Sequence, residues 1–546
     1  MRGHKALCSS AGSGFPGELC VNLRALCGKN IKYFKASIYY KWLNKILKTN
    51  IRTMSLKTLG ARIFAKIVHS QTQKWAKNPV ATQQKVFAQL LATAKSTRFG
   101  QEHDFYRINT YADFAAKVPV RDYEGLKSYV DRVVHGEEDV LWPGKPLYFA
   151  KTSGTTSGAK YIPLTAASMP YHITAARNAI LSYIHETGKA GFVDGKMIFL
   201  QGSPELEEKH GIKFGRLSGI VAHFVPAYLQ KNRMPSWETN IIDDWETKVD
   251  AIVGETINED MAVISGIPSW VQMYFEKLRQ KAGTPVGEIF KNFNLFIYGG
   301  VNYEPYRAKF ESLIGRRVDS IELFPASEGF FAYQDSQKEQ GMLLLLNAGI
   351  FYEFIKADEF FTDNPRRYSI GEVEVGVNYA LIISTNAGLW AYNIGDTVAF
   401  TSLAPYRVVV TGRIKHYISA FGEHVIGKEV ESALREAMAG EAVTVNEFTV
   451  APQINPESGL PYHEWLIEFG TEPNDLDAFA LKIDAAMRKQ NVYYDDLIVG
   501  NVLRTVVITK VATNGFQDYM KSIGKLGGQN KLPRLSNDRK IADYFK

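Results

Sequence analysis

Short apolar segments that end in glycine turns recur through the middle of the chain. Four of them have the length and composition of strands: Lys196–Leu200, Met261–Ile264, Leu295–Tyr298 and Ser320–Phe324. The stretches after two of these turns, Trp270–Leu278 and Pro305–Leu313, look helical. Short strands followed by glycine turns and helices are typical of an α/β sheet, in which ligands bind at the carboxyl ends of the strands. We therefore expect a site where these turns lie.

The chain on either side of this region has different patterns. Apolar side chains at helical spacing predict a helix over residues 80–96. Strands are predicted to dominate residues 342–411, at Met342–Leu346, Phe351–Ile355, Glu372–Val377, Ala380–Ser384 and Tyr406–Val410. The rest predicts a small α+β unit, with helices at Gly427–Met438 and Leu476–Gln490 and strands at Phe448–Ala451, His463–Phe469 and Val502–Ile508.

These patterns divide the chain, whose 546 residues are too many for one compact core. We expect an N-terminal extension over residues 1–53, a large domain over residues 54–411 and a small, mobile α+β domain over residues 412–546. The predicted fold class is α/β, with mixed β-sheets flanked by helices in the large domain.

The net charge of +7 comes from the N-terminal extension. Residues 1–53 carry ten lysines and arginines and one acidic residue, Glu18, whereas the remainder carries 54 basic and 56 acidic side chains. The body of the chain is thus close to neutral. This argues against a basic groove for nucleic acid.

The three cysteines, Cys8, Cys20 and Cys27, lie in the same extension. The body therefore has no disulfide frame, no cysteine-based zinc site and no thiol nucleophile. There is no apolar run of about 18 residues that would predict a membrane span, and the N-terminus lacks a credible signal peptide. We expect a cytoplasmic protein.

The extension itself allows two interpretations. Met54 is a plausible native start, so that residues 1–53 would be an upstream translation artefact or a poorly ordered tail. The alternative is a basic amphipathic membrane anchor around Tyr33–Ile51, where aromatic residues and lysines are interleaved.

The segment Thr152–Lys160, Thr-Ser-Gly-Thr-Thr-Ser-Gly-Ala-Lys, carries the strongest chemical signal. Glycines let backbone N–H groups approach a ligand, small hydroxyls add donors, and the lysine adds a mobile positive charge. That combination suits a polyphosphate. The spacing differs from the common P-loop, because three residues separate Gly154 from Gly158 and Ala159 precedes the lysine. A flexible surface loop is the alternative.

Two carboxylates follow other strand-like segments. Glu328 lies in a turn after an apolar strand, where it would suit Mg²⁺, which prefers one or two carboxylates plus phosphate oxygens. A surface carboxylate that caps a helix is the alternative. Asp396 follows a glycine turn and would accept two hydroxyls, as in ribose recognition; an ordinary turn aspartate is the alternative.

The order of these motifs resembles that of the adenylate-forming (acyl-CoA synthetase/luciferase-like) superfamily, whose members activate carboxylic acids as acyl adenylates. Thr152–Lys160 resembles its phosphate loop, Tyr392–Asp396 its ribose motif, and Thr411–Lys415 its domain-hinge motif. Within the superfamily the chain is most similar to the auxin-responsive Gretchen Hagen family of acyl-acid amido synthetases, as a bacterial-type member. This similarity rests on Ser265–Trp270, Tyr298–Gly300, Phe324–Glu328, Ala387–Asp396 and Gly528–Arg534.

The resemblance implies a nucleotide site with ATP and Mg²⁺ as cofactors. Glu328 would hold the metal, and Asp396 would bind the ribose hydroxyls. The catalytic residues would be Lys160, Arg413 and Lys531, with Lys540 as the alternative to Lys531. The other residues implied in nucleotide binding are Thr152, Ser153, Gly154, Thr155 and Thr156 at the phosphates, Gly300 and Val301 at the adenine, Ser327 next to Glu328 in the chain, and Lys415 at the hinge.

Two positions depart from the family pattern. Asn393 replaces the arginine or lysine usual after the motif tyrosine, which would weaken a phosphate or carboxylate contact. The hinge segment Gly412–Lys415 looks more like that of general acyl-CoA ligases, which leaves the acceptor open.

The function that follows is an ATP-dependent acyl-acid amido synthetase. A carboxylic acid would react with ATP to give acyl-AMP and pyrophosphate, and the acyl group would pass to an amine, with an amino acid as the expected acceptor. The alternatives are an acyl-CoA ligase and a catalytically silent nucleotide-binding protein. Aromatic residues such as Trp270, Tyr298, Phe324 and Trp390 could line an acid pocket, although core packing is favoured for most of them. No nucleic-acid partner is expected, and the oligomeric state stays open.

Overall fold

The computed structural model describes residues 55–546 apart from 156–157, 226–229, 243, 301–302, 358, 415–416, 419, 424 and 524–531. Residues 57–546 form one compact unit. The predicted extension over residues 1–53, with its suggested anchor and its cysteines, lies outside the described residues. Among the helices that are described, none has the length and apolarity needed to cross a membrane.

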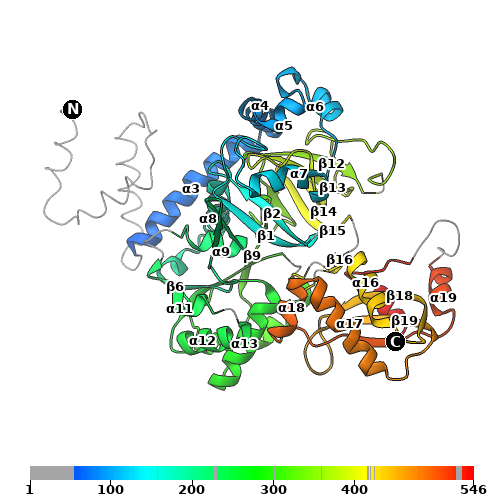
Figure 1. The fold of residues 1–546 in the computed structure, drawn as a ribbon. Coiled ribbons are helices and arrows are strands. Elements are labelled where there is room, and N and C mark those ends of the chain that lie inside the picture. The colour runs from blue at the N-terminus through cyan, green and yellow to red at the C-terminus, as the bar shows by residue number, and fades with distance from the viewer. Residues whose placement is uncertain are drawn as a thin grey trace, which may run out of the picture. The chain divides into compact units, whose positions relative to one another are not determined.

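A mixed sheet of eleven strands organises the described part of the chain (Figure 1). One half is antiparallel, in the order β12 (Ile350–Lys356), β13 (Asn378–Thr385), β14 (Tyr392–Leu403), β15 (Tyr406–Arg413), β11 (Met342–Leu344), β10 (Gly329–Tyr333) and β9 (Asp319–Ala326). From β9 the sheet continues in parallel through β8 (Leu295–Gly299), β7 (Met261–Ser265), β3 (Lys196–Phe199) and β6 (Arg233–Met234). This arrangement confirms the predicted α/β class.

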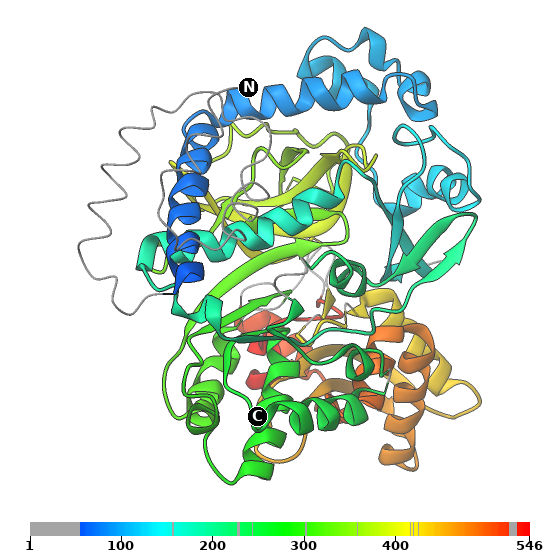
Figure 2. The same ribbon diagram turned by 90° about the vertical axis from the view of Figure 1, so that its left-hand side faces the viewer.

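Helices cover both faces of the parallel half (Figure 2). The reason is visible in β8, where side chains point alternately to the two faces. Leu295 and Ile297 pack in a cluster with α3 (Leu56–Ala76) and α8 (Met169–Thr187). Phe296 and Tyr298 pack in a second cluster, with α12 (Trp245–Thr256), α13 (Pro268–Ala282) and α15 (Glu304–Ile314).

A second sheet of four strands lies in the N-terminal half of the described chain. Its order is β2 (Gly158–Leu164), β1 (Tyr148–Thr155), β5 (Ile212–Gly215) and β4 (Glu207–Lys209). It shares a hydrophobic core with the antiparallel half of the large sheet. Helices that contribute to the same core are α4 (Pro79–Ala94), α5 (Arg98–Glu102), α6 (Tyr111–Lys117), α7 (Tyr123–Val134) and α9 (Leu217–Ala222).

The C-terminal elements build a separate core around β18 (Thr444–Gln453) and β19 (Tyr462–Thr471). Helices α16 (Gly427–Met438) and α17 (Leu476–Gln490) coincide with the predicted ones. The remaining described elements here are β16 (Tyr417–Ile418), β17 (Val425–Ile426), α18 (Val492–Val499), β20 (Val507–Lys510), α19 (Gly515–Ser522) and α20 (Lys540–Tyr544). The domain boundary near residue 411 stays a prediction.

Three local predictions are wrong. The strand predicted at Val502–Ile508 starts only at Val507, and it runs to Lys510. Glu372–Val377, whose charged and apolar residues alternate, is not a strand, because Gly376 takes a φ of 81°, outside the extended region. The segment contacts the sheet by one bridge, between Val375 and Phe400. The phosphate segment, expected as a loop, is mostly strand, since β1 runs to Thr155 and β2 starts at Gly158.

Candidate active site

A cavity of about 1710 Å³ collects residues from distant parts of the chain. Six of the predicted site residues line it: Thr152, Lys160, Gly300, Ser327, Glu328 and Asp396. They come from the β1–β2 hairpin, the end of β8, the β9–β10 turn and β14. The fold therefore brings together groups suited to phosphate, a cation and ribose hydroxyls.

The β1–β2 hairpin presents Thr152 and Lys160 opposite each other. The register shifts between Thr152 and Thr155, so the pairing is irregular where the glycine-rich sequence lies. The Lys160 ammonium lies 5.8 Å from the ring centre of Tyr123. That ring is held in turn, because the Tyr161 backbone N–H donates to the Tyr123 hydroxyl over 2.9 Å. The hairpin thus places Lys160 at the cavity, beside a tyrosine ring whose hydroxyl is held by a backbone hydrogen bond.

Several predicted phosphate ligands are described by backbone alone or not at all. Ser153, Gly154 and Thr155 belong to β1, but the side chains of Ser153 and Thr155 are outside the described atoms. Thr156 lies outside the described residues. Their predicted roles stay predictions.

Ser327 and Glu328 form the two-residue turn between β9 and β10, in which Ala326 pairs with Gly329. A strand follows this turn, so the alternative of a helix-capping carboxylate is wrong. The Tyr392 hydroxyl donates to Glu328 Oε1 over 3.4 Å, which joins the turn to the start of β14. Within the described residues no group of three His, Cys, Asp or Glu side chains could hold a metal by itself. One carboxylate beside a phosphate hairpin still fits Mg²⁺, which takes most of its ligands from phosphate and water.

Asp396 lies in β14, and its carboxylate is buried, with 8% of the residue exposed. Its backbone partner on β15 is Arg413, whose side chain is not among the described atoms. Asn393, the departure from the family pattern, serves its own strand, because its side-chain oxygen accepts the Gly395 N–H over 2.9 Å. Gly395 has a φ of 88°, which glycine adopts at little cost.

Of the remaining predicted nucleotide and hinge residues, some are described by the structure and others are not. Gly300, which follows β8, lines the cavity with a φ of 84°. Val301, Lys415 and Lys531 lie outside the described residues. Lys540, the alternative to Lys531, is 84% exposed at its side chain, pairs with Asp538 over 3.1 Å and does not line the cavity.

The predicted aromatic residues also separate by position. Trp270, Tyr298 and Phe324 line the cavity. Trp390 does not, because it is buried in the core beside Phe99, Phe105 and Trp142. Core packing is therefore the role of Trp390, as favoured from the sequence.

One face of α8, missed from the sequence, lines the cavity with His172, Ala176 and Ile180. Their spacing of four residues, the signal that could have revealed them, puts them on one side of a helix. Burial lowers the pKa of His172 to about 4, so its ring is neutral at physiological pH. Phe199 and Phe330 complete an apolar wall there.

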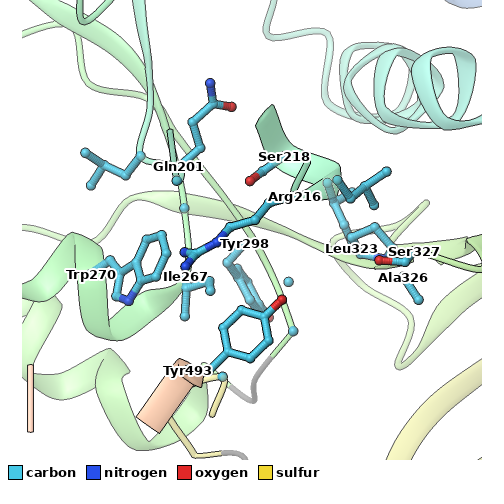
Figure 3. Close-up of a pocket in the computed structure, with 18 of the residues that line it drawn as sticks. Gln201, Arg216, Ser218, Ile267, Trp270, Tyr298, Leu323, Ala326, Ser327 and Tyr493 are labelled. Atoms are coloured by element: carbon cyan, nitrogen blue, oxygen red, sulfur yellow. The ribbon is translucent and has the colours of Figure 1, made fainter. Parts of the chain in front are cut away.

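Helix α18 and the loop before α9 contribute a polar wall that was not predicted from the sequence (Figure 3). Arg216 extends toward Tyr493 and forms an ion pair with Asp496. The Tyr493 hydroxyl donates to the Lys151 carbonyl over 3.3 Å, beside Thr152. Residues far apart in the sequence thus meet next to the phosphate hairpin.

Comparison with known proteins identifies the family. Three domain models match the chain in order: the GH3 family N-terminal domain over residues 68–240, the central domain over 343–413 and the C-terminal domain over 428–540. Together they cover more than half of the chain.

The curated relatives include two plant enzymes from Arabidopsis thaliana. The indole-3-acetic acid-amido synthetase GH3.3 is 28% identical over 198 residues, which are 34% of this chain and 33% of that protein. The indole-3-acetic acid-amido synthetase GH3.15 is 32% identical over 124 residues, 22% of this chain and 20% of that protein. The match thus spans about a third or less of these relatives. The expected bacterial type stays a prediction.

Solved structures share the fold at low identity. The GH3.15 acyl acid amido synthetase has a TM-score of 0.56 at 14% identity, covering 87% of this chain and 95% of that one. A 2-hydroxyisobutyryl-CoA ligase in complex with its acyl adenylate and CoA has a TM-score of 0.56 at 15% identity, covering 86% and 91%. These similarities show that the chain shares the fold of the two enzymes. The three domain matches in sequence order establish that the chain belongs to the GH3 family.

Proposed function

We propose that the protein is an ATP-dependent acyl-acid amido synthetase, an AMP-forming ligase that joins a carboxylic acid to an amine. The observation that carries this proposal is the cavity shared by Lys160, Glu328 and Asp396, which come from three separate segments. The family membership supports the same chemistry, since the curated relatives are named as amido synthetases.

In the first half-reaction a carboxylate oxygen attacks the α-phosphorus of ATP. An oxygen–phosphorus bond forms, the bond to pyrophosphate breaks, and acyl-AMP remains. Thr152, Ser153, Gly154, Thr155, Thr156 and Lys160 would hold the phosphates, Gly300 and Val301 the adenine, and Asp396 the ribose. Arg413 would reach the ribose or a phosphate, and Lys415 and Lys531 would act from the hinge and the C-terminal segment. The protein acts by positioning and by charge neutralisation.

Glu328 is the residue that would hold Mg²⁺ beside the phosphates, and Ser327, its neighbour in the same turn, would contact the nucleotide. When bound, the ion would neutralise negative charge on the leaving pyrophosphate. Support comes from the place of Glu328 in a tight turn that lines the cavity and from its hydrogen bond with Tyr392.

In the second half-reaction an amine attacks the acyl carbon. A carbon–nitrogen bond forms, the bond to the AMP oxygen breaks, and the amine gives up a proton to solvent. No protein nucleophile is needed, in keeping with the absence of cysteine from residues 54–546. The apolar wall of His172, Ala176 and Ile180 is suited to the acid, and the acceptor is an amino acid. We place the reaction in the cytoplasm, and we place the boundary between the large and the small domain near residue 411.

The test measures pyrophosphate release by the full chain with MgATP and a panel of carboxylic acids. Each acid is combined with amino acids, with CoA or with neither. We expect release that depends on the acid, and amide as the product. Lys160→Ala and Glu328→Gln should each lower the rate by at least about 100-fold. Lys189→Ala, a surface lysine paired with Asp319, is the control.

The arms of the panel separate the alternatives. Acid-dependent release that CoA alone accelerates would make the protein an acyl-CoA ligase. Bound ATP without release for any acid would favour a silent nucleotide-binding protein.

A further inference from the structure

Arg216 is a cation at the edge of the cavity whose counter-ion comes from a distant helix. It precedes α9, and its guanidinium pairs with Asp496 of α18 and lies 5.4 Å from the ring centre of Tyr493. Figure 3 shows the side chain extended across the cavity wall toward Tyr493, with Trp270 on one side. The proposed reaction so far assigns this group no role.

The position of Arg216 relative to the phosphate hairpin follows from the sheet register. Strands β1 and β5 are parallel neighbours, and Ala150 pairs with Gly215. Arg216 therefore leaves β5 at the level where Lys151 and Thr152 continue β1 into the hairpin. The hydrogen bond from Tyr493 to the Lys151 carbonyl fastens α18 at the same place. A group held by Arg216 would lie beside the phosphate of a bound acyl adenylate.

The Arg216–Asp496 pair is easily exchanged. The two side chains are 38% and 43% exposed. Ion pairs this accessible to water contribute about 0–1 kcal/mol, so a ligand carboxylate can replace Asp496 at little cost. A guanidinium also binds a carboxylate through two parallel hydrogen bonds, which fixes its orientation.

The other described lysines that line the cavity have other interactions or an assigned role. Lys151 pairs with Glu207 over 2.6 Å. Lys248 is buried, with 1% exposed, and donates to the Asn240 carbonyl over 2.5 Å. Lys160 belongs to the phosphate hairpin.

We propose that Arg216 binds the carboxylate of the acceptor, with Asp496 occupying that place until an acceptor arrives. The inference rests on the proposed amide synthesis and deepens it, because it names the residue that recognises the carboxylate of the amino-acid acceptor. With its carboxylate on Arg216, an amino acid directs its amine toward the acyl carbon beside the hairpin. The amine attacks that carbon, and AMP leaves with its oxygen.

The test compares an amino acid with its own carboxamide, which keeps the amine and side chain but lacks the negative charge. The full chain is supplied with MgATP and its acid, and amide formation is followed for both acceptors. Wild-type protein should favour the amino acid in kcat/KM by about 10-fold or more, the value of a charge-assisted pair. Arg216→Gln should bring the two acceptors within about twofold. Because kcat/KM for the amino acid is divided by that for its carboxamide, a general effect of the substitution on adenylation does not change the result.

Two further variants distinguish acceptor binding by Arg216 from a purely structural role, in which the Arg216–Asp496 ion pair only attaches α18 to the loop before α9. Asp496→Asn breaks the same ion pair but leaves the cation, so it should keep the preference and lower the KM for the amino acid. Arg488→Gln is the matched control, since Arg488 pairs with Asp495 at exposures of 38% and 40%. It should leave the ratio unchanged.

The inference is overturned if wild-type protein shows no preference, if Arg216→Gln retains it, or if Arg216→Gln and Asp496→Asn lose it equally. Exchange of labelled pyrophosphate into ATP with the acid alone reports adenylation separately. If pyrophosphate exchange occurs but the protein shows no acceptor preference, only the role of Arg216 is refuted and the proposed function stands. If no acid supports exchange, both the proposed function and this inference are refuted.

Discussion

Asp396 is a buried carboxylate at the cavity wall, which distinguishes it from the ordinary turn aspartate that the sequence allowed. A carboxylate at this wall can accept charge-assisted hydrogen bonds from the two ribose hydroxyls of ATP. Asp396→Asn should raise the KM for ATP by about 10- to 100-fold, the value of a lost charge-assisted hydrogen bond.

The check on that prediction uses a nucleotide without the hydroxyls. With 2′,3′-dideoxy-ATP the Asn variant and the wild-type protein should have similar KM values. Asp363→Asn, at an exposed position, is the control. Equal losses with ATP and its dideoxy analogue would contradict ribose recognition by Asp396.

His172 makes stability depend on pH, because burial lowers its pKa from the ordinary 6.5 to about 4. Between these values the unfolded chain binds a proton that the folded chain does not, so stability falls as the pH drops below 6.5. The loss from this residue should reach about 2 kcal/mol at pH 5. Urea unfolding at pH 7 and pH 5 should show it in wild-type protein, and His172→Leu should remove that part. An unchanged pH dependence in the variant would contradict a neutral, buried His172.

Single site residues could be predicted where a reactive side chain stands directly beside a recognisable strand or glycine in the sequence. Glu328 comes shortly after an apolar strand and Asp396 directly after a glycine, so their approach to a ligand could be expected. Arg216 and Tyr493 could not be found in this way, because nothing local marks them. Their importance arises from the β1–β5 register and the contact of α18 with Lys151.

At the scale of elements, the turn between β13 and β14 depends on one glycine. Gly388 has a φ of 92°, and a Cβ there would lie 2.7 Å from the Cβ of Leu141 and 2.8 Å from its carbonyl carbon. Gly388→Ala therefore adds a clash to the strain of a left-handed backbone and should cost more than about 2 kcal/mol of stability.

Gly376 is the matched control for that turn. It has a φ of 81°, but a Cβ there would meet nothing within 4 Å, so Gly376→Ala should cost only about 1 kcal/mol. Urea unfolding of both variants measures the difference. Equal losses would show that backbone strain alone, rather than the approach to Leu141, requires Gly388.

Elements with strong periodicity were predictable, and edges and turns were less so. The helices α16 and α17 coincide with their predicted bounds, and the buried strand β8 lies where its apolar run indicated. The long strand β14 was missed, because Gly395 with its φ of 88° interrupts the local pattern that usually marks a strand. Pairing with β13 and β15 overrides that local signal.

At the scale of the whole molecule, the proposed function requires one cavity to serve both adenylation and amide formation. The sequence predicted the nucleotide side of this cavity through the family resemblance. It did not predict that residues of α18 and the loop after β5 would line the cavity beside the phosphate hairpin, because that depends on contacts between segments about 280 residues apart.

The most direct test follows oxygen from the acid into the products. The full chain is given a carboxylic acid labelled with ¹⁸O in both carboxylate oxygens, MgATP and an amino acid, and the products are analysed by mass spectrometry. Attack on the α-phosphorus followed by amide formation predicts one ¹⁸O in AMP and one in the amide. Label in inorganic phosphate, or amide formed without labelled AMP, would contradict an acyl-adenylate pathway.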